Sequence, residues 1–108
     1  MVKFMIVFHK PSQQAAFENS YNDFLALVER MPNVKRRQVS SVLGSPMGDS
    51  PYYRVLEVYF DDYPQMQGAL NSAAGQEAGG QLNTFPPGSF EMVFAEVFEE
   101  AGGHTPTP

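Results

Sequence analysis

Four stretches of the chain combine alternating side chains with a high content of Val, Ile, Phe, Tyr and Met; they are residues 2–9, 34–43, 52–60 and 89–98. Pro, Gly, Asp or Asn residues border them, so each is predicted to be a β-strand. The first and third stretches carry apolar residues on both alternating sets, which is typical of strands that are covered on both faces. The second is polar along much of its length, with Lys35 and Arg37 among its residues, and indicates an edge strand.

Between the first two predicted strands the apolar spacing changes to three and four residues, which predicts a helix from about Ala15 to Arg30. The positions that form its apolar stripe are Phe17, Tyr21, Phe24, Val28 and Met31. Pro32 cannot continue this helix and ends it. After the third strand, Asp62 can cap a further helix. Ser72 can cap a second segment, but glycines disfavour helix interiors, so Gly75, Gly79 and Gly80 predict an irregular segment there.

The predicted element order is βαββαβ. With right-handed crossovers this order gives a four-stranded antiparallel sheet with the helices on one face, an α+β, ferredoxin-like fold. We expect one domain over residues 1–98 and a flexible tail over residues 99–108, where Gly, Thr and Pro replace the apolar pattern.

Helices on one face leave the other face of the sheet without cover from the same chain. We expect that uncovered face to carry several large apolar side chains. Burying each of them is worth about 1.5–3 kcal/mol, and exposed apolar patches usually mark interfaces. A second copy packed sheet to sheet would bury them, which predicts a homodimer around a barrel-like interior. The residues assigned to this face are Phe4, Phe8, Leu56, Val58, Met92 and Phe94.

The amino-acid composition excludes several kinds of functional site. The chain of 108 residues has no cysteine and a formal charge of -5, which excludes disulfides and thiolate chemistry and disfavours nucleic-acid binding. Two histidines make a metal site improbable, and no apolar run is long enough for a membrane span. No phosphate-binding loop, dinucleotide fingerprint or nucleophile elbow is present. We therefore expect a cytoplasmic protein without metal or other cofactor.

A few polar side chains within the apolar pattern are candidate site residues, each with a structural alternative. Tyr21 can line a pocket or simply pack in the core. Arg54 can extend to water, pair with Glu96 or bind an anionic ligand. Glu57 and Glu96 should be paired, exposed or functional rather than buried alone, and their alternation places them on opposite faces. His9 is expected at the surface.

Several phrases of the sequence resemble the EthD-like family, which is named after a protein of ethyl tert-butyl ether degradation and belongs to the dimeric α+β barrel superfamily. The phrases cover residues 52–62, 66–72, 75–76, 2–7 and 31–34, and the likeness extends over roughly residues 1–98. The resemblance implies a small-molecule pocket between sheet and helices in each subunit. The ligand-binding residues it suggests are Phe4, Ile6, Phe8, Tyr21, Phe24, Arg54, Leu56 and Phe94.

One position departs from the family pattern. Many members carry a His eight residues before the Pro that ends the first helix, and this chain has Phe24 there. Phe cannot transfer a proton, so the change weakens the expectation of acid–base catalysis and of haem ligation. Tyr21 is the remaining polar-tipped aromatic residue nearby.

Three functions follow from these observations. The first is binding of an apolar or aromatic metabolite, as an accessory to an oxygenative degradation pathway. The second is a cofactor-free cyclase, isomerase or monooxygenase that acts on a polyketide-like substrate. The third is a ligand-free structural dimer. An open cavity near Tyr21, Phe24 and Arg54 would favour the first two functions.

Overall fold

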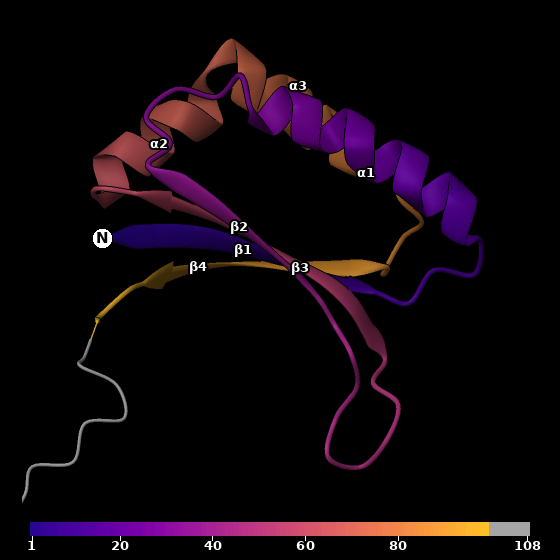
Figure 1. The fold of residues 1–108 in the computed structure, drawn as a ribbon. Coiled ribbons are helices and arrows are strands. Elements are labelled where there is room, and N and C mark those ends of the chain that lie inside the picture. The colour runs from indigo at the N-terminus through magenta and orange to yellow at the C-terminus, as the bar shows by residue number, and fades with distance from the viewer. Residues whose placement is uncertain (100–108) are drawn as a thin grey trace, which may run out of the picture.

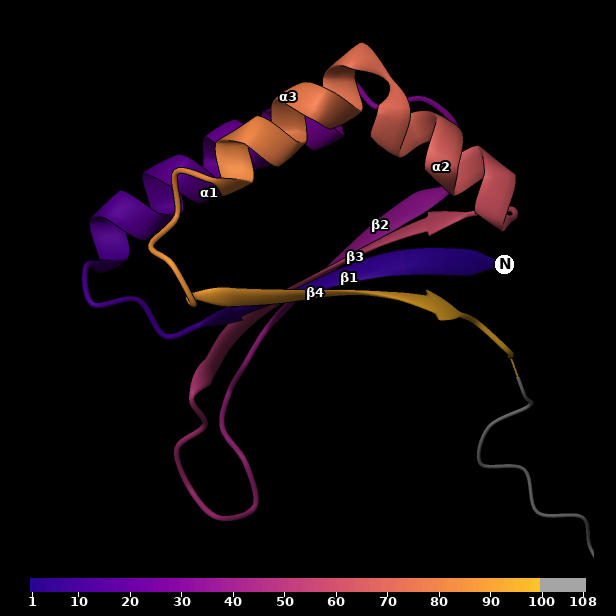
Figure 2. The same ribbon diagram turned by 180° about the vertical axis from the view of Figure 1, so that it is seen from behind.

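The computed structural model describes residues 1–99 (Figure 1). The predicted tail therefore lies, apart from Glu99, outside the described residues. Figures 1 and 2 show the helices together on one side of a single sheet. The elements are β1 (Val2–His9), α1 (Gln14–Val28), β2 (Arg36–Ser41), β3 (Tyr52–Phe60), α2 (Tyr63–Asn71), α3 (Ala73–Leu82) and β4 (Phe90–Glu96).

The sheet has the strand order β2-β3-β1-β4, and every neighbouring pair is antiparallel. The prediction of a four-stranded ferredoxin-like sheet with helices on one face is confirmed. All six residues of β2 are exposed, as expected for an edge strand. The second helical region is divided into α2 and α3, which meet at Ser72.

The face under the helices holds the core. Directly opposed residues of antiparallel strands share a face, and Phe4 lies opposite Val58 while Ile6 lies opposite Leu56. These side chains and Phe8 are between 0% and 2% exposed. Against them α1 packs its apolar stripe, which was predicted correctly; its buried residues are Phe17, Tyr21, Phe24 and Val28.

The assignment of six apolar residues to the uncovered face is therefore wrong. Phe4, Phe8, Leu56 and Val58 are core residues under the helices, and Met92 and Phe94 share their side of the sheet because they lie opposite Ile6 and Phe4. Alternation separates the side chains of a strand into two sets but does not say which set the helices cover. Here the bulkier, more aromatic set lies under the helices.

The uncovered face carries the other set. On β1 it presents Lys3, Met5 and Val7, and Glu57 and Val93 lie opposite Met5 on the two neighbouring strands. Met5 and Val7 are half-buried even though no helix covers them, and Val93 is 47% exposed. This face is thus a mixture of apolar side chains and charges rather than a purely apolar layer.

The glycine-rich segment is a regular helix, so the prediction of an irregular segment is also wrong. Ser72 caps α3 by accepting a hydrogen bond from the Gly75 amide at 3.1 Å. A Cβ atom at Gly75 would lie 2.1 Å from the carbonyl oxygen of Ala69. Glycine is therefore required where α2 and α3 meet, because any side chain would clash there. The low helix propensity of glycine is accepted at this position for that reason. The cap of α2 by Asp62 is as predicted, with the Gln65 amide as donor at 2.9 Å.

Candidate functional site

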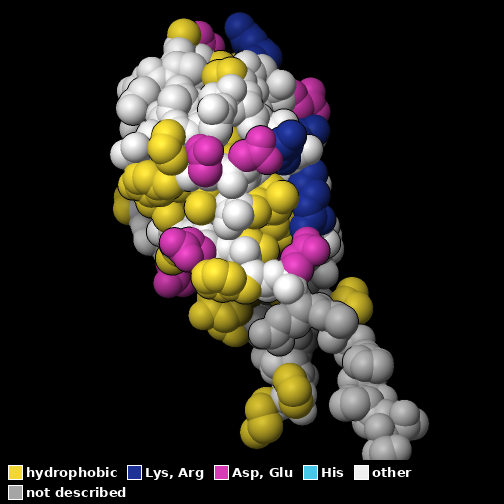
Figure 3. All heavy atoms as spheres, turned by 90° about the vertical axis from the view of Figure 1, so that its left-hand side faces the viewer, with side chains coloured by type: hydrophobic (Ala, Val, Ile, Leu, Met, Phe, Trp, Pro, Cys, Tyr) yellow, Lys and Arg dark blue, Asp and Glu magenta, His cyan; other side chains and the backbone are white. Residues whose placement is uncertain are grey.

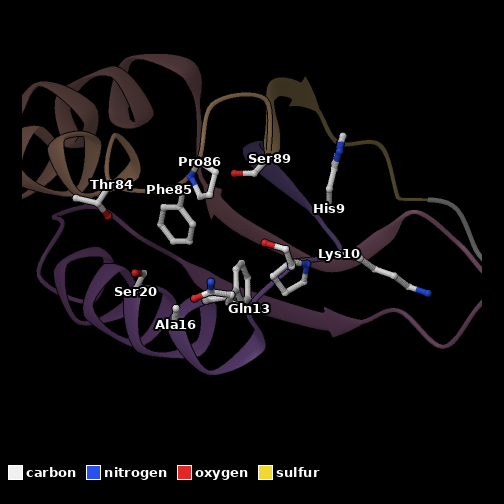
Figure 4. Close-up of a pocket in the computed structure, with 12 residues that line it drawn as sticks. His9, Lys10, Gln13, Ala16, Ser20, Thr84, Phe85, Pro86 and Ser89 are labelled. Atoms are coloured by element: carbon white, nitrogen blue, oxygen red, sulfur yellow. The ribbon is translucent and has the colours of Figure 1, made fainter.

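A cleft of about 500 Å³ lies between the start of α1 and the segment that joins α3 to β4 (Figure 4). The end of β1 closes it on a third side. Elements far apart in the sequence therefore form its walls. The lining residues are His9, Lys10, Pro11, Ser12, Gln13, Ala16, Phe17, Ser20, Thr84, Phe85, Pro86 and Ser89.

The residues at the ends of the neighbouring elements shape the walls of the cleft. Pro11 lies two residues beyond the end of β1 and has no backbone N–H to extend the strand ladder. Gln13 caps α1 without a side-chain hydrogen bond, so its side chain does not fold back over the first turn. On the opposite wall the turn at Pro86 and Pro87 ends in Gly88, which has a φ of 75°, a conformation that glycine adopts readily.

Two aromatic rings form the apolar part of the cleft. Phe17 and Phe85 are 8% and 5% exposed and meet edge to face, with ring centroids 5.7 Å apart. Phe8 lies behind both, at 5.4 Å from Phe17 and 5.3 Å from Phe85. These interlocked rings make a rigid surface on which a flat apolar molecule can stack.

Polar groups face the same space. Figure 4 shows Gln13, the N-cap of α1, and Ser20 on α1 across the gap from Phe85 and Ser89. The Ser89 hydroxyl is shielded from solvent and has no hydrogen-bond partner among residues 1–99, and a buried hydroxyl without a partner is unfavourable. The side chains of His9 and Lys10 extend away from the gap, and His9 Nε2 lies 2.9 Å from Glu91 Oε2.

The residues predicted to bind ligand do not form this cleft. Arg54 lies at the edge of the core, and Phe94 lines a second, smaller groove of about 270 Å³. The other six lie in the closed core, each no more than 3% exposed, and are Phe4, Ile6, Phe8, Tyr21, Phe24 and Leu56. Phe8 and Tyr21 contact the ring of Phe17, so they support the cleft from behind.

Arg54 is held by Glu18 of α1, and the predicted alternative of a pair with Glu96 is wrong. Its two terminal nitrogens donate to the Glu18 carboxylate at 2.6 and 3.0 Å, a bidentate geometry. Tyr53 also donates to Glu18, at 2.8 Å. These bonds, first of all those from Arg54, lower the pKa of Glu18 below its usual value. The guanidinium also lies 4.6 Å from the ring centre of Tyr21.

The hydroxyl of Tyr21 is buried without a hydrogen-bond partner in the described part of the chain. Burial raises the pKa of Tyr21, while the nearby Arg54 opposes that shift. Tyr21 therefore stays protonated near neutral pH and can donate a hydrogen bond but cannot act as a base.

A second polar network lies on the uncovered face. Glu57 accepts hydrogen bonds from Lys3 Nζ and from the Tyr59 hydroxyl, both at 2.7 Å. The guanidinium of Arg36 lies 4.0 Å from the ring centre of Tyr59. The bond from Lys3 is the main cause of the lowered pKa of Glu57, and the same bond raises the pKa of Lys3. Of the three alternatives predicted for Glu57, which were a paired, an exposed or a functional side chain, the structure shows the paired one.

Among residues 1–99, no cluster of three or more His, Asp or Glu side chains is arranged to hold a metal ion. No helix in that range is long and apolar enough to cross a membrane. The cleft was not predicted from the sequence, because its walls come from two loops and the first two turns of α1. Ser12, Gln13 and Ser89 look like ordinary loop residues in the sequence, and only the Pro residues at 11 and 86 mark the segments as rigid.

Comparison with known proteins places this geometry in context. No family model matches the chain. It is 29% identical over 100 residues to an uncharacterized 11.0 kDa protein from the thcB-thcC intergenic region of Rhodococcus erythropolis, covering 89% of this chain and 94% of that protein. An ethyl tert-butyl ether degradation (EthD) family protein from Bacillus halodurans superposes with a TM-score of 0.86 and 28% identity, covering 91% of this chain and 99% of that structure.

More distant structures share the fold. A dimeric ferredoxin-like protein of unknown function from Jannaschia sp. has a TM-score of 0.68 and 16% identity, over 90% of this chain and 100% of its own. SnoaB, a cofactor-independent oxygenase from Streptomyces nogalater, has a TM-score of 0.68 and 17% identity, over 94% and 96% of the two chains. The resemblance to the EthD-like family indicated by the sequence motifs is thus confirmed in sequence and in fold.

Proposed function

We propose that this EthD-like protein binds a small, largely apolar or aromatic molecule in the cleft between α1 and the α3–β4 segment. The observation that carries the proposal is a cavity of about 500 Å³ whose lining combines the aromatic rings of Phe17 and Phe85 with the polar side chains of Gln13 and Ser20. Typical small-molecule pockets fall in this size range and combine apolar walls with a few polar groups that orient the ligand.

The lining residues suggest the class of ligand. A planar ring can stack on one of the Phe17 and Phe85 rings and meet the other edge to face, because their planes are inclined at 66°. A hydroxyl or carbonyl group on that ring can hydrogen-bond to Ser20. No charged side chain points into the gap in Figure 4, so a neutral aromatic alcohol or ketone fits better than a multiply charged metabolite. Binding of such a compound suits an accessory to an oxygenative degradation pathway. Phe8 and Tyr21 would act as a second layer that holds the aromatic wall.

We also propose that the protein is a homodimer that pairs through the uncovered face of its sheet. Met5, Val7 and Val93 on that face are apolar, and the Lys3–Glu57 pair is only 20% and 18% exposed at its side chains. The ferredoxin-like relative from Jannaschia is described as dimeric. A sheet-to-sheet contact would complete the barrel that the fold leaves open.

The ligand proposal can be tested by NMR titration with p-cresol and 2-naphthol as probes. We expect saturable shifts of the backbone amides of Ala16, Ser20 and Ser89. Ala16→Phe should fill the cleft and weaken binding at least tenfold, because the new ring occupies the ligand volume. Ala26→Phe, at an exposed position further along the same helix, is the matched control and should leave binding unchanged.

Equal effects of the two substitutions, or shifts confined to residues outside the cleft, would contradict the proposed site. No saturable binding of any aromatic probe would favour the ligand-free structural dimer instead.

Catalysis without a cofactor is a second candidate function. The fold is shared with a cofactor-independent oxygenase, and the unpartnered Tyr21 hydroxyl beside Arg54 would become a hydrogen-bond donor to a developing oxyanion if the core opened to admit a substrate. The test is oxygen consumption with a polyketide-like phenol as substrate, monitored with an oxygen electrode. Loss of turnover in Tyr21→Phe with unchanged binding would support catalysis, and absence of turnover in the unmodified protein would exclude it for this substrate.

A further inference from the structure

The connection between β2 and β3, residues 42–51, forms an ordered arm. Its tip is a tight turn in which Ser45 and Gly48 exchange backbone hydrogen bonds of 2.7 and 2.9 Å. Gly44 and Gly48 have φ values of 156° and 113°, which other residues adopt only with strain. The Met47 amide also donates to the Ser45 hydroxyl. The arm is thus held in one conformation by its own bonds, although it packs against little else.

Two large apolar side chains on this arm have no contact that explains them. Leu43 is 103% exposed and Met47 is 94% exposed, more than any other large hydrophobic residue in the described chain. Burial of such a side chain is worth about 1.5–3 kcal/mol. A rigid arm that presents both of them to water indicates a surface that receives them.

The opposite end of the same chain offers an apolar groove. It has a volume of about 270 Å³ and lies between the start of α2 and the end of β4; its lining residues are Val2, Tyr63, Met66, Phe94, Ala95 and Glu96. Phe94 is 53% and Tyr63 is 46% exposed. Figure 3 looks onto this end of the molecule, where apolar side chains gather and the Lys and Arg side chains keep to one border.

β4 is the second edge strand, and it carries exposed apolar side chains beside the exposed carboxylates of Glu91 and Glu96. The other edge strand, β2, is lined by Arg36, Arg37 and Gln38, which discourages pairing with other chains. β4 instead carries Phe94 and Val93, 53% and 47% exposed. The apolar residues at the end of β4 therefore add to the exposed apolar surface beside the groove.

The arm cannot fill the groove of its own chain. Figures 1 and 2 agree that the arm leaves the sheet on the side away from the helices, whereas the groove lies at the other end of β1, beside α2. The exposed arm residues and the open groove lie on distant parts of one chain. In a pair of copies, the arm of each chain can bury its apolar side chains in the groove of the other. Two-fold symmetry makes this contact reciprocal.

We propose that the arm of one copy docks Leu43 and Met47 into the groove at Phe94 and Tyr63 of a second copy. This contact deepens the proposed homodimer and rests on it, but it is independent of the ligand cleft. In this dimer the two sheet faces form the central contact, and each arm adds a further contact at the periphery. The partner for which this surface is suited is therefore this same chain.

Disulfide trapping tests the contact directly, because the chain contains no native cysteine. Met47→Cys and Phe94→Cys are prepared as separate variants, mixed, and oxidised under mild conditions. We expect a cross-linked species of twice the chain mass on a non-reducing gel, formed at least tenfold faster than with the control pair Met47→Cys and Gln76→Cys. Gln76 is exposed on α3, away from the groove.

A rate equal to that of the control, or faster linkage of Met47→Cys to itself, would overturn the proposal. A second readout avoids dependence on cysteine chemistry. Leu43→Ser combined with Met47→Ser should raise the dimer dissociation constant at least tenfold by sedimentation, since the arm is exposed and the change does not touch the core. An unchanged dissociation constant would overturn the arm contact while leaving the dimer itself standing, and unaltered p-cresol shifts would show that the cleft is intact in this variant.

Discussion

The two faces of the sheet differ in how they are covered and in how polar their side chains are. Under the helices, Phe4, Ile6 and Phe8 are at most 2% exposed and pack into an apolar core. On the other face, Lys3 and Met5 alternate with them, and a bonded network of Lys3, Glu57 and Tyr59 lies among half-buried apolar residues.

This difference indicates that one face stabilises the single chain and the other face serves for association. The covered face supplies the apolar burial that folds a single chain. The uncovered face is polar enough to tolerate water before assembly, and its fixed charges favour one orientation of a partner over others. Substitutions on the two faces should therefore differ in their effect on the stability of the protein.

The largest effect is expected from a cavity under the helices. Phe8→Ala should lower the free energy of unfolding by about 3–5 kcal/mol, because the ring packs against Phe17, Tyr21 and Phe85. Met5→Ala, on the same strand but on the uncovered face, where Met5 is half-buried within its own chain, should cost less than Phe8→Ala. Urea unfolding at one fixed protein concentration measures both, and equal losses would contradict the division between the faces.

An intermediate effect is expected from the network on the uncovered face. Glu57→Gln should lower the free energy of unfolding by about 1–2 kcal/mol at pH 7, because it removes a charge-assisted bond to Lys3. The pKa of Glu57 is lowered in the folded protein from its usual value of 4.5. Its contribution is therefore present above pH 4.5 and is lost as the pH falls through the folded pKa.

The pKa of Lys3 is raised from 10.5 in the folded protein, so its contribution is full below pH 10.5 and is lost as the pH rises through the folded pKa. The difference between the unmodified protein and Glu57→Gln should thus be constant near neutrality and shrink at both extremes. Unfolding curves at pH 3, 7 and 11 check this profile, and a difference that persists unchanged at pH 3 would contradict the assignment.

The smallest effect is expected from Arg36 at the border of the uncovered face. Arg36→Gln removes the cation from the ring of Tyr59 and should cost about 0.5–1 kcal/mol. Arg30→Gln is the matched control, because Arg30 is 66% exposed at its side chain and its nearest carboxylate oxygen, on Glu77, lies 4.0 Å away. Thermal unfolding should separate the two variants; indistinguishable midpoints would mean that the stack on Tyr59 contributes nothing.

Much of this fold could be predicted from sequence because its signals are local. The strand boundaries, the stripe of α1 and the caps at Asp62 and Ser72 depend on neighbouring residues. The regular helix over Gly75 could not be predicted, because it depends on a close backbone approach that only the folded chain reveals.

The site was harder to predict because it depends on long-range packing. The alternation of side chains along β1 predicts which residues share a face of the sheet, but not which face the helices cover. Phe4 and Phe8 were therefore predicted on the wrong face. The partner of Arg54 is Glu18, which is 36 positions away on a helix. The cleft joins Gln13 to Ser89, and no periodic pattern links two loops.

The account depends most on the claim that the uncovered face is an interface between two copies, and one pair of variants tests it directly. Val93 on that face and Val39 on the side facing the helices are valines in edge strands, 47% and 48% exposed. Sedimentation velocity at micromolar concentration should find the unmodified protein and Val39→Asp as dimers of about twice the 12.0 kDa chain mass. Val93→Asp should sediment as a folded monomer, and a Val93→Asp dimer of undiminished affinity would contradict the central claim.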